Sequence, residues 1–241
     1  MKSASRIATA LCALWLVSGC DQPLPSPKQK EQTPKAETTK QPVDAAYVQA
    51  LNTYQAQGMA GLQKALACVG NLRTALPGFL AAPDDNGLKD VFELARHCHR
   101  LYLPAVALTA SYPALDARLT SLRRRIDSRP ITPGYVDYVE GYPESGIVND
   151  PALPLTRESL IAEQGLTDAA DVVLGFEVIL FLLEGEHRYK PLLPVRVAAD
   201  YEAVAQWPEQ ADSEALPPSD HPRNRRRQYL LLVTEVLEQD L

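Results

Sequence analysis

The stretch DAADVVLGFEVILFLLEGEH, residues 168–187, decides the fold because it is the most apolar part of the chain outside the N-terminal leader. Within residues 172–183 only Gly175 and Glu177 are not large hydrophobic residues. Apolar side chains on every face predict a helix buried at the centre of the protein. At about 1.5 Å per residue, this helix is too short to cross the roughly 30 Å hydrocarbon core of a membrane.

Glu177 is the single charge inside this apolar segment. An unpaired carboxylate is costly to bury, so Glu177 must be neutralised, hydrogen-bonded or paired. We expect its partner to be an arginine, such as Arg196, or a tyrosine of the loop that contains Tyr135 and Tyr138. The functional alternative is a position that recognises a ligand. Glu184, seven residues further on, lies on nearly the same helix face and is a second acidic candidate.

The N-terminus has the pattern of a bacterial lipoprotein signal peptide, residues 1–19. Lys2 and Arg6 precede an apolar run over residues 7–17, and the sequence VSGC ending at Cys20 resembles a lipobox. We therefore expect Cys20 to carry lipid and to anchor the protein on the periplasmic side of the cell envelope, with the choice of membrane left open. An ordinary secretory signal that is cleaved elsewhere is the alternative.

The next segment, residues 20–43, has the composition of a disordered tether, since it is rich in Pro, Lys, Gln and Thr and has almost nothing to bury. The chain as a whole has 241 residues, of which 46% are hydrophobic and 22% charged, so residues 44–241 are expected to form one globular domain. Without Lys2 and Arg6, 22 basic residues remain against 30 acidic ones, which argues against a nucleic-acid partner. The arginine runs at 123–125 and 225–227 are interpreted as solvated helix ends.

Two cysteines remain after the signal peptide and the lipid site, namely Cys68 and Cys98. The segment AAPDDNG, residues 81–87, lies midway between them and is rich in turn residues. If it joins two antiparallel helices, the two cysteines lie at equal heights on neighbouring helices. In an oxidising compartment this predicts a disulfide. The alternative is a pair of buried thiols that do not meet.

The hydrophobic spacing predicts an all-α fold, an up-and-down bundle of about four main helices. A long ordered crossover loop, residues 127–156, contains at most a short helical turn at 135–140. Thr156 is expected to cap a short helix, and Ser219 or Asp220 to cap the last one. The predicted helices cover residues 43–76, 88–110, 113–125, 156–164, the central apolar segment, 197–205 and 223–241.

The residues offer little support for an enzyme. The chain has four histidines and no His-Glu-x-x-His motif, and it also lacks a nucleophile elbow, a phosphate-binding glycine loop and a dinucleotide fingerprint. His97 and His99 flank Cys98, but residues two apart point to different faces of a helix, so this trio is a weak metal-site candidate. Acid–base chemistry by Glu177 and Glu184 would need cooperation across about 10 Å.

Three segments resemble the imelysin family, whose members are periplasmic, often lipid-anchored proteins linked to insulin-cleaving metallopeptidase activity and to bacterial iron uptake. They are YVDYVEGYPESGIVND at 135–150, LGFEVILFLLEGE at 174–186 and RRRQYLLLVTEVLEQDL at 225–241. Arg196, Asp200 and Tyr201 also fit an element of that family. The resemblance covers residues 44–241, which corresponds to the first of the family's two helical bundles.

The chain departs from the family at the residues that would hold a metal. The signature Gly-x-His-x-x-Glu reads Gly175, Glu177 and Leu180 here, and the family's earlier Thr-Glu pair falls at Tyr102 and Leu103. The resemblance therefore implies a degenerate relative without catalytic residues. We expect no firm cofactor, with iron or zinc at Glu177 as a weak candidate.

The expected function is that of a non-catalytic binding or accessory component in iron acquisition. The alternatives are a residual metal-dependent peptidase and a periplasmic iron-binding protein. The expected partners are the membrane, through the N-terminal lipid, and a protein that supplies or replaces the second bundle. The candidate ligand-binding residues are Glu177, Glu184, Arg196, Asp137 and Tyr138.

Overall fold

The computed structural model describes residues 44–110, 117–193, 195–206 and 217–241, and every regular element in them is a helix. This confirms the predicted all-α bundle. The predicted signal peptide, the lipid site at Cys20 and the tether lie outside the described residues. No helix in the described part of the chain has the length and apolarity that a membrane crossing requires.

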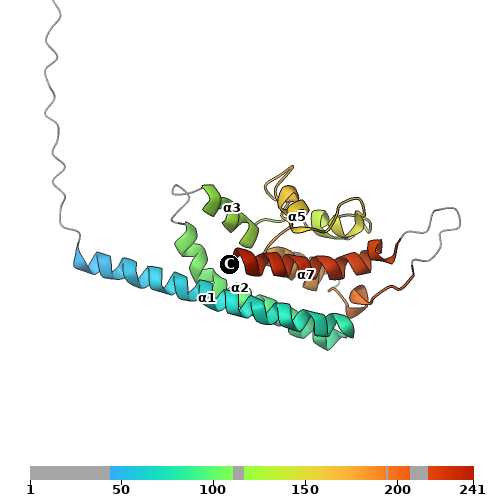
Figure 1. Ribbon diagram of the computed structural model, residues 1–241, viewed down its shortest axis with the longest axis horizontal. Coiled ribbons are helices and arrows are strands. Elements are labelled where there is room, and N and C mark those ends of the chain that lie inside the picture. The colour runs from blue at the N-terminus through green and yellow to red at the C-terminus, as the bar shows by residue number, and fades with distance from the viewer. Residues whose placement is uncertain (1–43, 111–116, 194, 207–216) are drawn as a thin grey trace, which may run out of the picture. The chain divides into compact units, whose positions relative to one another are not determined.

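The first two helices, α1 (Ala45–Ala81) and α2 (Asp85–Ala110), form a long antiparallel hairpin (Figure 1). Its turn is the predicted one, and the Asp84 carboxylate caps α2 by accepting a hydrogen bond from the Gly87 N–H at 2.6 Å. The predicted disulfide is confirmed, because Cys68 on α1 and Cys98 on α2 are bonded with their Cα atoms 5.3 Å apart.

Helix α1 does not end before Pro77, as the sequence predicted, but continues through it to Ala81. Proline removes one backbone hydrogen bond and strains the preceding turn. Leu76, Phe79 and Leu80 are all buried in the core around it, and this packing offsets the loss. At the other end of α1, residues 44–57 are all exposed, so the hairpin packs into the core only from Gly58 onwards.

The central apolar segment is buried as predicted, but only part of it is helical. Helix α6 (Phe176–Glu184) packs against α2 and against α7 (Pro222–Asp240), and residues 176–183 are all buried. Residues 171–173 have no helical structure, and Gly175 precedes α6 with a φ of +93°. The Gln164 side chain accepts hydrogen bonds from the Val173 and Leu174 N–H groups at 2.9 and 3.1 Å, so the extended backbone is satisfied without a helix. Gly185 ends α6 at the predicted position.

Two buried tyrosines bind the backbone of this segment. The Tyr229 hydroxyl on α7 donates to the Val173 carbonyl at 2.6 Å, and the Tyr201 hydroxyl donates to the Leu182 carbonyl at 2.7 Å. Burial, as the main cause, raises the pKa of both phenols, and it raises that of Tyr102 to about 12. All three therefore stay protonated at pH values where free tyrosine ionises.

The free energy of unfolding is accordingly expected to fall as the pH rises above about 10, because the unfolded chain releases phenolic protons that the folded chain retains. This contribution is complete below pH 10 and is lost as the pH approaches the folded-state pKa values. Urea unfolding at a series of alkaline pH values measures it, and Tyr229→Phe should reduce the dependence. A stability that does not change up to pH 11, roughly one unit above the free phenol's pKa, would contradict this expectation.

The crossover between α3 (Ala117–Ile126) and α6 contains three short helices, α4 (Pro133–Val136), η1 (Ile147–Asn149) and α5 (Arg157–Glu163). The helical turn predicted at 135–140 instead begins at Pro133, whose fixed φ favours the first helical position. Thr156 caps α5 as predicted, accepting from the Ser159 N–H at 3.1 Å. The predicted start of α3 at Pro113 lies outside the described residues.

After α6 the chain forms η2 (Gly185–Arg188), η3 (Ala198–Tyr201) and η4 (Pro218–Asp220) before it enters α7. The helix predicted over 197–205 is thus only the short turn η3. The cap of α7 is neither Ser219 nor Asp220, because the His221 ring nitrogen Nδ1 accepts from the Arg223 N–H at 3.1 Å.

The arginine run at 225–227 is not a solvated helix end. Arg225 and Arg226 are 4% and 3% exposed. Arg225 donates to the carbonyls of Ile147, Val148 and Leu153, while Arg227 donates to those of Leu80 and Tyr201. Arg225 thus satisfies carbonyl groups of the irregular crossover, and Arg227 satisfies carbonyl groups at the end of α1 and in η3.

Candidate functional site

Glu177 lies in the first turn of α6 and is 4% exposed. The positive φ of Gly175 turns the chain into α6, and a side chain at this glycine would collide with the carbonyl groups of Arg125 and Ile126. Glycine therefore allows the start of α6 to contact the end of α3. A carboxylate in the first turn also has a favourable interaction with the helix dipole.

The carboxylate of Glu177 is held by two arginines and a tyrosine. Arg188 binds it through two hydrogen bonds, Nη2 to Oε1 at 2.9 Å and Nε to Oε2 at 3.0 Å. Arg129 Nη2 also lies 2.9 Å from Oε1, and the Tyr189 hydroxyl lies 3.3 Å from Oε2. The prediction that a buried Glu177 must be neutralised, hydrogen-bonded or paired is confirmed, and two-point arginine–carboxylate contacts are among the stronger ones in proteins.

The partners predicted for Glu177 were wrong. Arg196 binds the Leu182 carbonyl and Asp137 instead, and the Tyr135 hydroxyl donates to Glu163. The actual partners come from the turn that follows α6 and from the loop that follows α3, which no local sequence pattern connects to Glu177.

Burial and the neighbouring charges keep the partners of Glu177 protonated. Burial, followed by the negative charge of Glu177, raises the pKa of Tyr189 above its ordinary value. For Arg188, burial lowers the pKa, but the hydrogen bond and the charge of Glu177 outweigh this effect and raise it overall. At neutral pH, Glu177 therefore faces two guanidinium cations and one neutral phenol.

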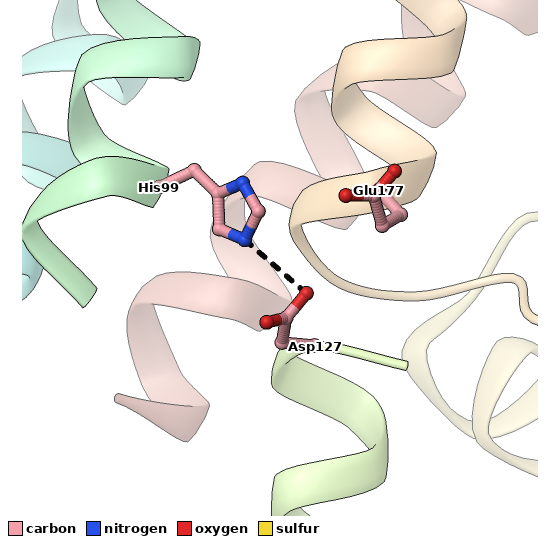
Figure 2. A group of neighbouring side chains, drawn as sticks. All are labelled: His99, Asp127 and Glu177. Carbon is pink, nitrogen blue, oxygen red and sulfur yellow. Dashed lines mark ion pairs between the residues drawn. The ribbon is translucent and has the colours of Figure 1, made fainter. Parts of the chain in front are cut away.

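Two further polar side chains point toward Glu177 and come from different elements (Figure 2). His99 lies on α2, with its ring stacked on Phe176 at a centroid distance of 4.9 Å, and Asp127 directly follows α3. His99 Nε2 and Asp127 Oδ1 are 3.3 Å apart, and one ligand atom from each of His99, Asp127 and Glu177 lies within 4.8 Å of the others. One nitrogen and two oxygen atoms are a donor set that transition metals accept.

This arrangement corrects the weak metal-site candidate from the sequence. Cys98 is in the disulfide and His97 is exposed, so the trio around Cys98 does not form a site. His99 instead joins residues distant in sequence. A signal for its burial was present, because Ala95 and Tyr102, four residues before and three after, place His99 on the apolar face of α2. Asp127 and Arg129 carried no such signal.

The site opens into a pocket of about 360 Å³ lined by Arg129, Pro130, Ile131, Glu177, Arg188 and Tyr189. Arg129 lies at its rim, since 53% of its side chain is exposed, whereas the Glu177 side chain is 5% exposed. Glu184 belongs to the same group, because its Oε2 lies 3.6 Å from Arg188 Nη1. Arg188 therefore connects the two acidic candidates of α6.

The remaining candidate residues lie in a second group. The fully buried carboxylate of Asp137 contacts Arg226, at 2.6 and 3.0 Å, and Arg196 Nη2 at 2.9 Å. The Arg196 guanidinium also lies 4.4 Å from the ring centre of Tyr138. These contacts tie the crossover loop to α7, and none of them involves Glu177.

No model of a known protein family matches this chain, and no curated protein matches it either. The resemblance to the imelysin family therefore stays a prediction that rests on the motifs quoted above.

Proposed function

We propose that this protein is a lipid-anchored, non-catalytic binding component of the bacterial cell envelope that serves iron acquisition, as its resemblance to the imelysin family implies. The observation that supports this proposal is the burial of Glu177 and the set of side chains that bind its carboxylate. It occupies the position of the family's motif histidine, and it is a buried carboxylate held by Arg188, Arg129 and Tyr189 at the base of an open pocket.

The contacts of Glu177 favour binding over catalysis. A zinc peptidase requires about three protein ligands and a metal-bound water, and the motif glutamate that would offer one ligand in the family is Leu180 here. Leu180 is completely buried in the hydrophobic core. Both carboxylate oxygens of Glu177 are already in contact with guanidinium or phenol groups.

The pocket at Glu177 has the properties of a recognition site. The Arg129 guanidinium contacts the carboxylates of Asp127 and Glu177, and about half of its side chain is exposed at the rim of the pocket. A ligand can therefore replace these contacts without unfolding the core. Among the alternatives, an iron-binding protein is favoured over a peptidase by the convergence of His99 and Asp127 on Glu177.

Deleting the gene in its parent bacterium is expected to slow growth when a chelator withholds iron. The wild-type gene should restore growth. A gene that carries Glu177→Gln should not, because Arg129 and Arg188 then lose the carboxylate charge that positions them. Glu93→Gln is the matched control, since Glu93 pairs with Arg96 on the surface of α2. Immunoblots ensure that equal amounts of protein are compared, and Cys20→Ala in the same strain tests the membrane attachment.

Two results would contradict this proposal. One is a deletion strain that grows normally without iron. The other is a purified protein that cleaves insulin in a reaction that a chelator stops.

A further inference from the structure

Three possible metal-ligand atoms lie close together near Arg129, and two of them already have the spacing of metal ligands. Two ligands that each lie about 2.1 Å from a metal ion, at the angles of a tetrahedron or an octahedron, are separated by about 3.0–3.4 Å. His99 Nε2 and Asp127 Oδ1 are 3.3 Å apart, and Glu177 completes the triangle within 4.8 Å. The three residues come from α2, the end of α3 and α6, so the core of the bundle holds them in place.

Asp127 carries an unsatisfied acceptor that points into this triangle. Its side chain is 8% exposed, and Oδ1 is buried with no hydrogen-bond partner. His99 Nε2 lies 3.3 Å and Arg129 Nε 3.5 Å from this oxygen. A buried carboxylate oxygen without a donor is costly, and a bound cation would satisfy it.

His99 directs its Nε2 atom toward Asp127 (Figure 2). Arg129 Nη2 lies 2.9 Å from His99 Nε2 and 3.5 Å from Nδ1, so the guanidinium group approaches the face of the ring. Neutral histidine binds metals through an unprotonated ring nitrogen, and Nε2 lies 3.3 Å from Asp127 Oδ1. Figure 2 shows the His99 ring and the Asp127 carboxylate directed toward each other beside Glu177.

The Arg129 guanidinium contacts all three residues. Its Nη2 is 2.9 Å from both Glu177 Oε1 and His99 Nε2, and its Nε is 3.5 Å from Asp127 Oδ1. It thus supplies a positive charge at the place where a metal ion would supply one. Because half of its side chain is exposed, Arg129 can rotate into solvent without opening the core.

We propose that His99, Asp127 and Glu177 form a binding site for a divalent transition-metal cation, and that Arg129 is an internal competitor that the cation displaces. When the cation binds, Glu177 Oε1 exchanges Arg129 for the metal, while Oε2 keeps its contacts with Arg188 and Tyr189, which orient the carboxylate. The proposal rests on the proposed binding function and specifies the ligand of that site. A mixed nitrogen and oxygen donor set is suited to Fe²⁺, Mn²⁺ or Zn²⁺.

Calorimetric titration of the full-length, detergent-solubilised protein with Zn²⁺ tests the competition. Arg129→Ala is expected to bind Zn²⁺ at least about tenfold more tightly than the wild type, because it removes a positive charge a few ångströms from the ion. Arg96→Ala is the matched control, since this exposed arginine of α2 contacts only a surface glutamate among the ion pairs of the described residues, and its affinity should equal that of the wild type.

The ligands are tested in the Arg129→Ala background, where binding is strongest. Adding His99→Ala or Asp127→Asn is expected to weaken Zn²⁺ binding at least about tenfold, since each removes one of three protein ligands. Co²⁺ serves as a spectroscopic probe, and its visible absorption should change when the histidine nitrogen is lost. Circular dichroism and thermal unfolding identify any variant that has lost its fold. If one of the two ligand variants is unfolded, the Zn²⁺ affinity of the other tests the site.

Equal Zn²⁺ affinity in the wild type and in Arg129→Ala would overturn the proposal, and so would affinity that neither His99→Ala nor Asp127→Asn changes. These outcomes are distinct from failure of the proposed function. A protein that does not bind metal but still supports growth without iron would refute only the metal site. Metal binding accompanied by chelator-sensitive proteolysis would refute only the non-catalytic function.

Discussion

Replacing Asp137 with asparagine is expected to lower the free energy of unfolding by about 3–5 kcal/mol, which is typical when one member of a buried ion pair is removed. Asp137 is fully buried and is the shared counter-ion of Arg226 and Arg196, whose side chains are 3% and 1% exposed. Asparagine has nearly the same shape but no charge. Two buried guanidinium groups would therefore lose the carboxylate that compensates them.

Urea unfolding of the wild type and of Asp137→Asn measures this loss directly, since urea does not screen charges. The matched control is Glu93→Gln, which removes the same charge from an exposed pair on α2. Its effect should lie within about 0.5 kcal/mol, as is usual for surface ion pairs. A loss below about 1 kcal/mol for Asp137→Asn would mean that Asp200 or water takes over the role of Asp137.

Gly175→Ala is expected to cost roughly 3 kcal/mol or more, because it combines backbone strain with a collision in the core. The φ of +93° at Gly175 lies in the region that side chains rarely adopt, and an added Cβ would overlap the carbonyl groups of Arg125 and Ile126. Relief of this overlap requires the end of α3 to move away from the start of α6. Asp127 and Glu177 lie on the two sides of that contact, so we also expect weaker metal binding.

The thermal unfolding midpoint and the calorimetric Zn²⁺ affinity of Gly175→Ala test both parts of this prediction. Gly78→Ala is the control, because Gly78 is inside α1 and nothing lies within 4 Å of its added Cβ. An exposed helical glycine replaced by alanine should raise the stability by up to about 1 kcal/mol. A Gly175→Ala protein as stable as Gly78→Ala would show that the contact between α3 and α6 adapts easily.

The metal-site proposal depends on the same local geometry. Glu177 alone is weak evidence for a metal, since a single carboxylate is more often simply paired with an arginine. The unsatisfied oxygen of Asp127 and the contacts of Arg129 with all three donors are what make the site specific.

Much of the fold could be predicted from local patterns. The turn at 81–87 predicted the hairpin, and from it the pairing of Cys68 with Cys98, because a symmetrical turn determines which residues of two helices meet. Thr156 and Gly185 were identified as helix boundaries because capping depends on residues within one turn. The extended backbone before α6 was missed because the Gln164 side chain that satisfies it comes from another element.

The candidate site could be predicted only in part. The burial of Glu177 and its need for a polar or charged partner follow from the apolarity of its neighbours. Its partners do not, and the arginines of α7 show why. Arg226 and Asp137 are 89 residues apart, and three consecutive arginines in a sequence resemble a solvated surface.

The sequence by itself determined the all-α class, which segment is buried and which cysteines pair, because hydrophobic spacing, caps and turns act over a few residues. Only the tertiary structure decided that Arg188 and Arg129 hold Glu177, and that His99 and Asp127 join them. The physical reason is that the interaction between charged groups depends on their distance in space and not on their separation in the sequence. That distance depends on how α2, α3 and α6 pack, which no single stretch of the chain specifies.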